Sequence, residues 1–288
     1  MKVVLFTKFN EAWDARELGE YLTSVGYDGA DLPVRYGYHF NPDNVRETLP
    51  EGVRIWSEMG LTCELISTET NLIDPANRDS LAIYEAAAEA GVPIIKIGFF
   101  RHSPGEDYWE KVSAARRALE GFARLSERTG VKTVYQTHSG TCLGSNCAGI
   151  MHLLRGMDPK WVGAHVDGGH IAINGEDIEM GLAMCRDYLT VIGAKDARHV
   201  PDKRPNRPAP YGPAFVFLGH GAAHWRRLLK TVKKWGFDGP ITVHTEYTED
   251  QDVLFTVGGK DLSEGAESRR EVGAAEDLRF LRREWERA

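Results

Sequence analysis

The chain has 288 residues, of which 42% are hydrophobic and 27% charged, as is typical of a globular protein with a sizeable core. Its net charge of −7 opposes non-specific attraction to nucleic acid and to anionic membranes. No apolar run approaches the roughly 18 residues of a membrane span, and polar residues interrupt the apolar N-terminus too early for a signal peptide. We therefore expect a cytosolic protein that acts on a small molecule.

Short β-type segments alternate with helical segments along the chain. A strand at 2–6 precedes a helix at 13–25, and a strand at 27–34 precedes a helix within 41–59. The same pattern predicts further strands at 61–67, 92–99, 131–138, 162–167, 189–195 and 239–246, and helices at 78–90, 108–128, 146–154, 178–187 and 225–235. Alternation of this kind requires parallel strands with right-handed crossovers, and eight units predict a single-domain (β/α)₈ TIM barrel.

Two stretches fall outside the repeat. Residues 198–214 are rich in Pro, Arg and Asp and predict a long loop. After about residue 250 the chain has a charged loop and an extra helix at about 274–285, expected to pack on the outside of the barrel. The barrel is therefore predicted over about 1–250 and an extension over about 251–288, whose charged residues form a solvated face or a homo-oligomer contact.

The stretch 162–170 carries the clearest functional pattern. His165 and Asp167 are two residues apart on a predicted strand, so their side chains leave on one face, and His170 follows from the turn after it. Two imidazoles and a carboxylate can bind a divalent cation, move protons or hydrogen-bond a polyol. They are equally compatible with polar groups at a strand end that neighbours satisfy, and His165, one layer deeper, is also compatible with a core histidine.

Two lysines interrupt otherwise apolar strands. Burying Lys96 or Lys195 is costly without a partner or a function. Either one suits binding of an anionic substrate group or stabilisation of an enolate. The alternative is that both reach solvent past the strand ends, or pair with a carboxylate such as Asp196.

Candidate substrate contacts also lie at the rim. His220 stands between two glycines of a loop that in barrels often approaches substrate oxygens or phosphate. Arg101 and His102 follow the fourth predicted strand and are either rim contacts or solvent-facing residues.

Several motifs occur in a fixed order along the chain: GYDGADL at 26–32, VDGGH at 166–170, KD at 195–196, LGHG at 218–221, and WGFDGPITV at 235–243. In this order they resemble the xylose-isomerase-like TIM barrels, the sugar phosphate isomerase/epimerase superfamily. The resemblance extends over nearly the whole barrel. It implies a site at the C-terminal mouth of the barrel and a carbohydrate or polyol substrate.

The resemblance also implies a divalent cation, held by a Glu on the fifth strand, an Asp on the sixth, a His on the seventh and a Glu on the eighth. By position, Asp167 is retained, whereas Gln136, Gly193 and His244 replace the other three ligands.

A shifted metal site is a second prediction. Gln136 and His138 share one strand face, as do His244 and Glu246. His138, Asp167 and His244, with an oxygen from Gln136 or Glu246, would suit Zn, Mn, Fe or Co, and the resemblance adds Mg.

These residues predict an isomerase or epimerase that abstracts a proton next to a carbonyl, with His138, His244 or Glu246 as the base and a metal or the lysines stabilising the enediolate. A lyase or dehydratase that acts on a keto sugar or keto-glycoside would begin with the same step. A non-catalytic sugar-binding barrel is a third hypothesis, which the density of polar residues at the strand ends disfavours. The acidic balance disfavours a fourth, a DNA-repair endonuclease of the same superfamily.

Overall fold

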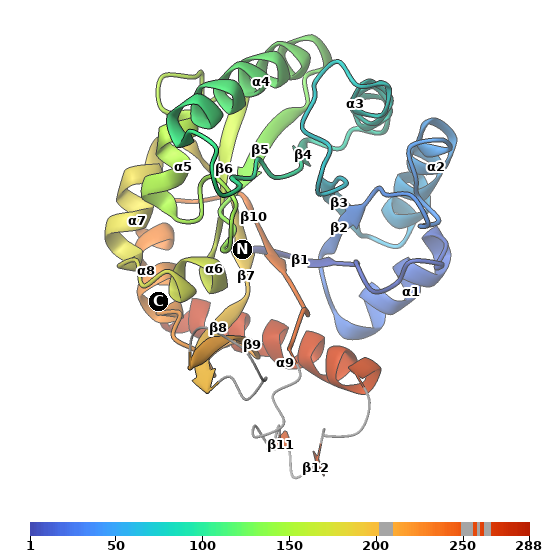
Figure 1. The fold of residues 1–288 in the computed structure, drawn as a ribbon. Coiled ribbons are helices and arrows are strands. Elements are labelled where there is room, and N and C mark those ends of the chain that lie inside the picture. Colours follow the sequence, from blue (N-terminus) through green and yellow to red (C-terminus); the bar gives the residue numbers. More distant parts are fainter. Residues whose placement is uncertain (202–209, 249–255, 258–259, 262–265) are drawn as a thin grey trace.

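The computed structural model describes residues 1–201, 210–248, 256–257, 260–261 and 266–288. Eight parallel strands form a closed barrel, in which β1 pairs with both β2 and β10 (Figure 1). The strands are β1 Lys2–Phe6, β2 Gly29–Pro33, β3 Thr62–Ser67, β4 Ile94–Lys96, β5 Lys132–Gln136, β6 Val162–Asp167, β7 Leu189–Ala194 and β10 Pro240–Val243. The predicted (β/α)₈ barrel is confirmed.

An outer ring of helices covers the strands (Figure 1). It consists of α1 Ala15–Val25, α2 Val45–Glu58, α3 Arg78–Ala90, α4 Tyr108–Thr129, α5 Cys147–Leu154, α7 Ile178–Cys185 with a 3₁₀ turn at Arg186–Tyr188, α8 Trp225–Lys234 and α9 Ala266–Arg287. Asp14 forms a capping box with Glu17 at the start of α1, and Gly26 ends that helix at φ 93°. None of the described helices is long and apolar enough to cross a membrane.

The last helix is longer than predicted. It starts at Ala266 rather than near residue 274, and it packs on α8 and β10. At its other side, the Arg282 guanidinium donates to the Gly26 carbonyl at 2.6 Å, so α9 lies between α8 and α1 and completes the ring. Ala274, Leu278 and Leu281 are buried, as expected for a helix on the outside of the barrel.

Two elements differ from the sequence predictions. The loop predicted at 198–214 is wrong at its two ends, because Asp196–Pro201 (β8) and Tyr211–Val216 (β9) pair as antiparallel strands, and its middle part, 202–209, lies outside the described residues. Both strands of a two-stranded ribbon are edge strands, which tolerate Pro and charged residues because the backbone groups on their outer side have no hydrogen-bonding strand. His170 lies in a short helix, α6 (Gly168–Ile173), rather than in a turn, because the Asp167 carboxylate caps that helix.

The inside of the barrel is packed and apolar below the mouth. Four buried side chains from β3, β4, β5 and β7 form a cluster that is separate from the core between strands and helices: Leu65, Ile94, Val134 and Val191. Such packed layers close a barrel of this size to solvent, so chemistry is confined to the C-terminal ends of its strands.

Asp277 of α9 is a buried carboxyl group that ties the last helix to the barrel. It accepts hydrogen bonds from the Leu218 backbone N–H at 2.8 Å and from the Tyr247 hydroxyl at 2.7 Å. Burial raises its pKa to about 8. The folded state therefore binds a proton that the unfolded chain releases near pH 4, and this contribution to stability is lost as the pH rises from about 4 through about 8.

We predict that Asp277→Asn removes this part of the pH dependence, because an amide keeps the neutral hydrogen-bonding role at every pH. Relative to the wild type, the variant should gain stability between pH 5 and pH 8.5 when the free energy of unfolding is measured in urea. Glu276→Gln is the matched control, since Glu276 is the neighbouring acid and pairs with Arg279 at the surface. Equal pH slopes for Asp277→Asn and wild type would contradict the assignment.

Candidate active site at the mouth of the barrel

The polar residues of the strand ends gather in one layer above the apolar cluster. Lys96, Gln136 and Gly193 each lie two residues beyond a member of that cluster, so they face the same way, toward the mouth. Eight polar side chains of this layer are at most 4% exposed: Asp31, Lys96, Gln136, His165, Asp167, His170, Lys195 and His244. Such a density of buried polar groups is costly to fold and is typical of a functional site.

Asp167 lies at the centre of this layer. Its Oδ1 accepts the backbone N–H groups of Gly169 at 3.0 Å and His170 at 3.1 Å, and its Oδ2 accepts the Gln136 amide at 2.9 Å. Burial raises its pKa to about 6. Because Asp167 caps α6, it also fixes the position of the His170 ring.

His165 and His244 approach each other beside Asp167, with ring centroids 5.8 Å apart and the rings edge to face. No protein group among the described residues hydrogen-bonds any of their four ring nitrogens. The His244 Nδ1 lies 3.6 Å from the Asp167 Oδ2. Burial keeps the pKa of both imidazoles well below its ordinary value, so both are neutral.

Gly193 faces the side chains of Asp167 and His165. A Cβ at this position would lie 2.9 Å from the Asp167 Oδ2 and 2.9 Å from the His165 Nε2, closer than such contacts normally come. His165 and Asp167 therefore occupy the space that a side chain at 193 would need.

His138 and His170 form a second imidazole pair, with ring centroids 4.0 Å apart. The Ser139 backbone N–H, which can only donate, points at the His170 Nδ1 at 3.2 Å, so the neutral His170 ring carries its proton on Nε2. The His138 Nδ1 lies 2.9 Å from the Ser139 carbonyl oxygen and donates to it, which leaves a lone pair on Nε2. One ring thus presents an acceptor and the other a donor.

The two imidazoles of this second pair stay neutral at physiological pH. Burial and the Lys195 charge lower the pKa of His138 to about 4. Burial, Lys195 and His138 hold the pKa of His170 well below its ordinary value.

Lys195 is paired with Glu246, and the other oxygen of that carboxylate pairs with Lys8. Burial opposes the charge of Lys195, but Glu246 and Asp167 outweigh burial and raise its pKa. Burial would likewise raise the pKa of Glu246, but Lys195, His244 and Lys8 hold it well below its ordinary value. Lys195 is therefore a fixed positive charge at the mouth.

The sequence left open that Lys195 pairs with Asp196 or reaches solvent. The Lys195 side chain does neither, because it is buried and pairs with Glu246. Asp196 instead accepts backbone N–H groups from Ala197 at 2.8 Å, Gly219 at 2.9 Å and Ala223 at 3.0 Å, and so holds the loop that carries His220. His220 itself is exposed and lies beside Phe217, without a described contact to the buried layer.

Lys96 has a different environment from Lys195. Its Nζ lies 4.5 Å from the centroid of the Phe99 ring, and none of the described residues forms a hydrogen bond or ion pair with it. Burial and the Arg35 charge lower its pKa to about 7, against the opposing charge of Asp31. Asp31 accepts from the Thr242 hydroxyl at 3.0 Å, and burial raises its pKa to about 6.

The sequence analysis did not single out Lys8, Asp31, Arg35 or Ser139. Lys8 follows the predicted strand at 2–6 by two residues, Arg35 directly follows the one at 27–34, and Asp31 is the charged residue within the buried strand β2. These positions, within or just after a strand, were the signals by which the sequence could have indicated them as site residues. The predicted Arg101 is exposed at the rim, where its guanidinium lies 3.5 Å from the Cys142 sulfur.

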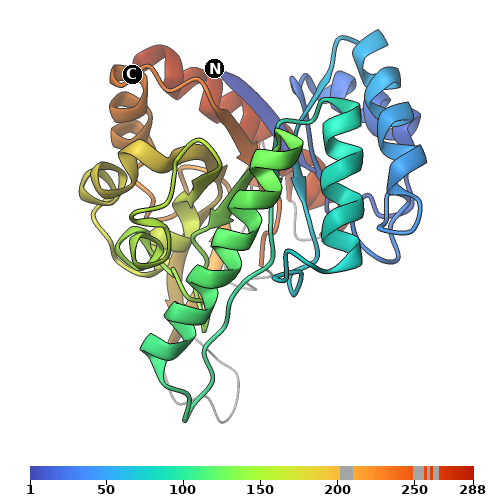
Figure 2. The ribbon, with the colours of Figure 1, turned by 90° about the horizontal axis from the view of Figure 1, so that it is seen from above.

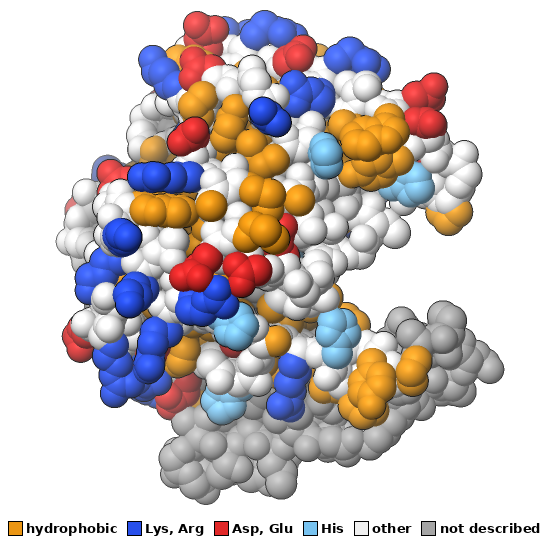
Figure 3. Space-filling view, turned by 90° about the vertical axis from the view of Figure 1, so that its left-hand side faces the viewer, with side chains coloured by type: hydrophobic (Ala, Val, Ile, Leu, Met, Phe, Trp, Pro, Cys, Tyr) orange, Lys and Arg blue, Asp and Glu red, His pale blue; other side chains and the backbone are white. Residues whose placement is uncertain are grey.

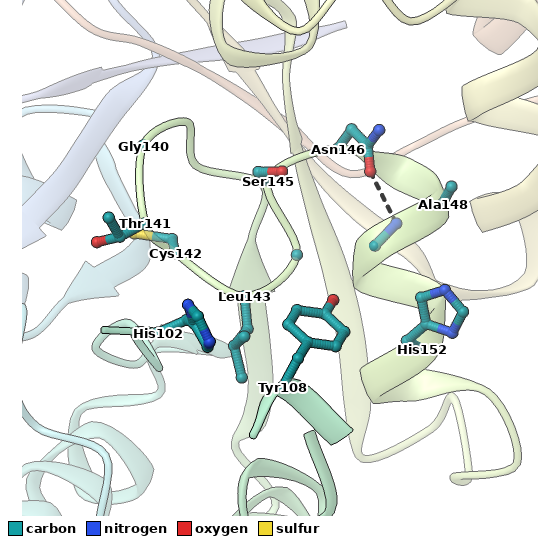
Figure 4. A pocket seen from close by; sticks show the side chains of 12 residues that line it. His102, Tyr108, Gly140, Thr141, Cys142, Leu143, Ser145, Asn146, Ala148 and His152 are labelled. Carbon is teal, nitrogen blue, oxygen red and sulfur yellow. Dashed lines mark hydrogen bonds between the residues drawn. The ribbon is translucent and has the colours of Figure 1, made fainter. Parts of the chain in front are cut away.

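A pocket of about 520 Å³ adjoins the mouth (Figure 4). His102 and Tyr108 line one side, at the N-terminal end of α4 that projects beyond the barrel, and His152 of α5 lines another (Figure 2). Cys142 connects the pocket to the mouth of the barrel, because it lines the pocket and its sulfur lies 3.6 Å from the His138 Nδ1. From the side of α5 and α7 the surface is deeply hollowed, with His and hydrophobic side chains along the described part of the edge (Figure 3).

The order of the strands and the position of this polar layer are those of a known family. The family model for the xylose isomerase-like TIM barrel matches residues 20–284, almost the entire chain. The chain belongs to the xylose isomerase-like TIM barrels.

Individual members of the family are only distantly similar to this chain. An inosose dehydratase from Lacticaseibacillus casei is 26% identical over 147 residues, which are 49% of this chain and 48% of that protein. The chain thus spans about half the length of this curated relative.

Two solved structures of the same fold are similar over nearly their full length. A 3-keto-D-glucoside 4-epimerase from E. coli has a TM-score of 0.67 at 15% identity, with 98% of this chain and 99% of the other covered. A D-psicose 3-epimerase from Clostridium cellulolyticum H10, solved with D-tagatose, has a TM-score of 0.69 at 15% identity, with 99% of both chains covered.

The metal positions of the xylose isomerase-like TIM barrels do not fit a cation in this chain. Among the described residues, no three His, Cys, Asp or Glu side chains are arranged to hold one, so the predicted shifted set of His138, Asp167 and His244 is not formed. Gln136 turns its amide N–H toward Asp167, and Gly193 has no room for a ligand. The Lys195 charge is directed at the same carboxylates that a cation would need.

Proposed function

We propose that this protein is an isomerase or epimerase of keto sugars or related keto-polyols, which moves a proton at the carbon next to the carbonyl. The observation that carries the proposal is the pair formed by His138 and His170, which presents a proton acceptor and a hydrogen-bond donor side by side at the mouth. The family supports a sugar substrate, as do the similar 3-keto-D-glucoside 4-epimerase and D-psicose 3-epimerase.

In the proposed step, the lone pair of the His138 Nε2 takes the proton from the carbon next to the carbonyl. The electrons of that C–H bond form a carbon–carbon double bond, and the carbonyl oxygen becomes an enolate oxygen. The His170 Nε2–H donates to this oxygen, and Lys195 supplies positive charge nearby. Because burial makes protonated His138 a strong acid, it readily returns the proton to the neighbouring carbon, which isomerises the sugar. Epimerisation also requires the planar intermediate to turn over, so that the proton returns to its opposite face.

Glu246 is a weaker candidate for the base than His138. Both of its oxygens already accept from Lys195 and Lys8, and these charges hold its pKa well below its ordinary value. We assign it the role of positioning Lys195. His165 and His244, whose ring nitrogens have no described protein partner, are assigned to the hydroxyl groups of the substrate.

A lyase that acts on a keto-glycoside is the second candidate function. It shares the first step, after which the enolate expels the substituent at the next carbon. The pocket of about 520 Å³ beside His138 favours this reading, because it has room for the second ring of a glycoside.

Proton exchange tests both candidates. The protein is incubated in deuterated water with a panel of ketohexoses, an inosose and a 3-keto-glucoside, and deuterium next to the carbonyl is followed by NMR. Exchange with a new stereoisomer indicates an epimerase, and exchange with loss of the substituent indicates a lyase. Saturable sugar binding without exchange would overturn both in favour of the sugar-binding barrel.

We predict that exchange does not depend on a divalent metal, because Lys195 supplies positive charge next to Asp167, the retained residue of the ligand set that the family resemblance implies. Excess chelator should change the rate by less than about twofold, and Lys195→Met should lower it by about 10²-fold or more. Lys195→Arg is the matched control that keeps the charge. A rate that falls at least about tenfold with chelator and returns with Mn²⁺ would contradict the prediction.

A further inference from the structure

The two lysines of the mouth are held in opposite ways. Lys195 pairs with Glu246, and that carboxylate and Asp167 favour its charged form. Lys96 has no such ion pair among the described residues, and its Nζ lies over the Phe99 ring. When two groups of the same kind have environments that favour opposite protonation states, they commonly have different chemical roles.

The Lys96 amine has the properties of a nucleophile. It is buried at 4% exposure, at the C-terminal end of β4 and in the layer that faces the mouth. A primary amine attacks a carbonyl only when it is neutral, and burial next to Arg35 opposes the ammonium form.

Phe99 packs against both this amine and the proposed base. The same ring that lies 4.5 Å from the Lys96 Nζ has its centroid 4.4 Å from that of His138. The His138 ring in turn contacts the His170 ring, with centroids 4.0 Å apart and the planes tilted by 35°. Lys96 and His138 thus share one aromatic neighbour, and the Lys96 charge acts on His138, so a substrate beside this ring would meet the amine and the imidazole together.

We propose that Lys96 forms a Schiff base with the ketone of the substrate, a proposal that rests on the proposed function. The Nζ attacks the carbonyl carbon, a C–N bond forms, and the oxygen takes a proton to give a carbinolamine. That hydroxyl then takes a second proton, which we assign to Asp31 because its carboxyl group interacts with the Lys96 charge, and leaves as water. Of the two hydrogens on the neutral amine, one is transferred to the oxygen when the carbinolamine forms and the other stays on the nitrogen, so loss of water breaks the C–O bond and leaves a protonated imine.

The protonated imine performs the task of a metal cation. It draws electrons from the neighbouring C–H bond, so that loss of this proton to His138 gives a neutral enamine rather than a bare enolate. Reprotonation at carbon and addition of water reverse the sequence and release the product and the free amine. In this sequence His170 and Lys195 act on the carbonyl oxygen before it leaves as water.

Reductive trapping tests the proposal on the full-length protein. The protein is incubated with D-fructose or dihydroxyacetone and sodium cyanoborohydride near pH 7, which reduces the imine to a stable secondary amine, and the modified lysine is located by peptide mass spectrometry. We expect labelling of Lys96 at least about tenfold faster than that of Lys132, another lysine with a pKa lowered by burial, at the opposite end of the barrel.

Two variants guard against misfolding. Lys96→Arg keeps a cation but forms no imine, and Lys96→Met has neither the cation nor an amine that could form an imine. In either variant the peptide should carry no adduct, and Lys132→Met should leave the Lys96 adduct unchanged.

The outcomes separate this proposal from the proposed function. Deuterium exchange without faster labelling of Lys96, or exchange retained in Lys96→Arg, overturns the Schiff base and leaves the proton transfer standing. A Lys96 adduct without exchange supports the Schiff base and overturns the isomerase. Equal labelling of Lys96 and Lys132, with no exchange, overturns both.

Discussion

Replacement of His138 by Ala is expected to lower the rate of deuterium exchange by about 10²- to 10⁴-fold, the range typical of removing a positioned general base. The His138 Nδ1 donates to the Ser139 carbonyl oxygen, which leaves the Nε2 with a lone pair that can take a proton. The effect should fall on kcat, since substrate hydroxyls are assigned to other imidazoles. Exchange measured by NMR at saturating substrate checks it.

The neighbouring ring provides a comparison. His170→Asn keeps an N–H donor, whereas His138→Asn keeps no group that can take a proton, so the first should lose less activity than the second. His152→Ala is the control, because His152 lies in the adjoining pocket and not in the pair formed by His138 and His170. Equal losses in the variants at 138 and 152 would exclude His138 as the base.

The barrel could be predicted from the sequence because each strand is a short apolar run and each helix has its own stop signal. The strand at 162–167 and the helix at 78–90 have the bounds that were predicted. The β8–β9 ribbon was missed, because its sequence is rich in Pro, Arg and Asp, and its pairing spans a segment without local pattern. Local periodicity does not report antiparallel pairing at a distance.

The residue types of the site could be predicted, but not their pairing. His138 and His170 belong to different strand–helix units, and Lys195 and Glu246 are 51 residues apart, so only the closed barrel brings them together. The period of two along a strand placed Gln136 and Asp167 at the mouth correctly. It does not show that the amide of one would donate to the other, or that His165 would fill the space beside Gly193.

That packing leads to a prediction for Gly193→Ala. The added Cβ would lie 2.9 Å from both the Asp167 Oδ2 and the His165 Nε2, inside a layer of fully buried side chains. We expect a loss of about 1–3 kcal/mol in the free energy of unfolding, as is usual for overpacking. Exchange should also fall, because Asp167 positions His170. Urea unfolding and the NMR assay measure the two effects.

The matching test removes the side chain that the new methyl group meets. His165→Ala opens space beside residue 193, so Gly193→Ala combined with His165→Ala should be more stable than the sum of the single variants predicts, by about 0.5–3 kcal/mol. Gly193→Ala combined with the distant His152→Ala should simply add. Because the Asp167 contact remains in the first double variant, the rescue should be partial. Strict additivity in both pairs would mean that His165 does not fill the space in which the family carries a side chain.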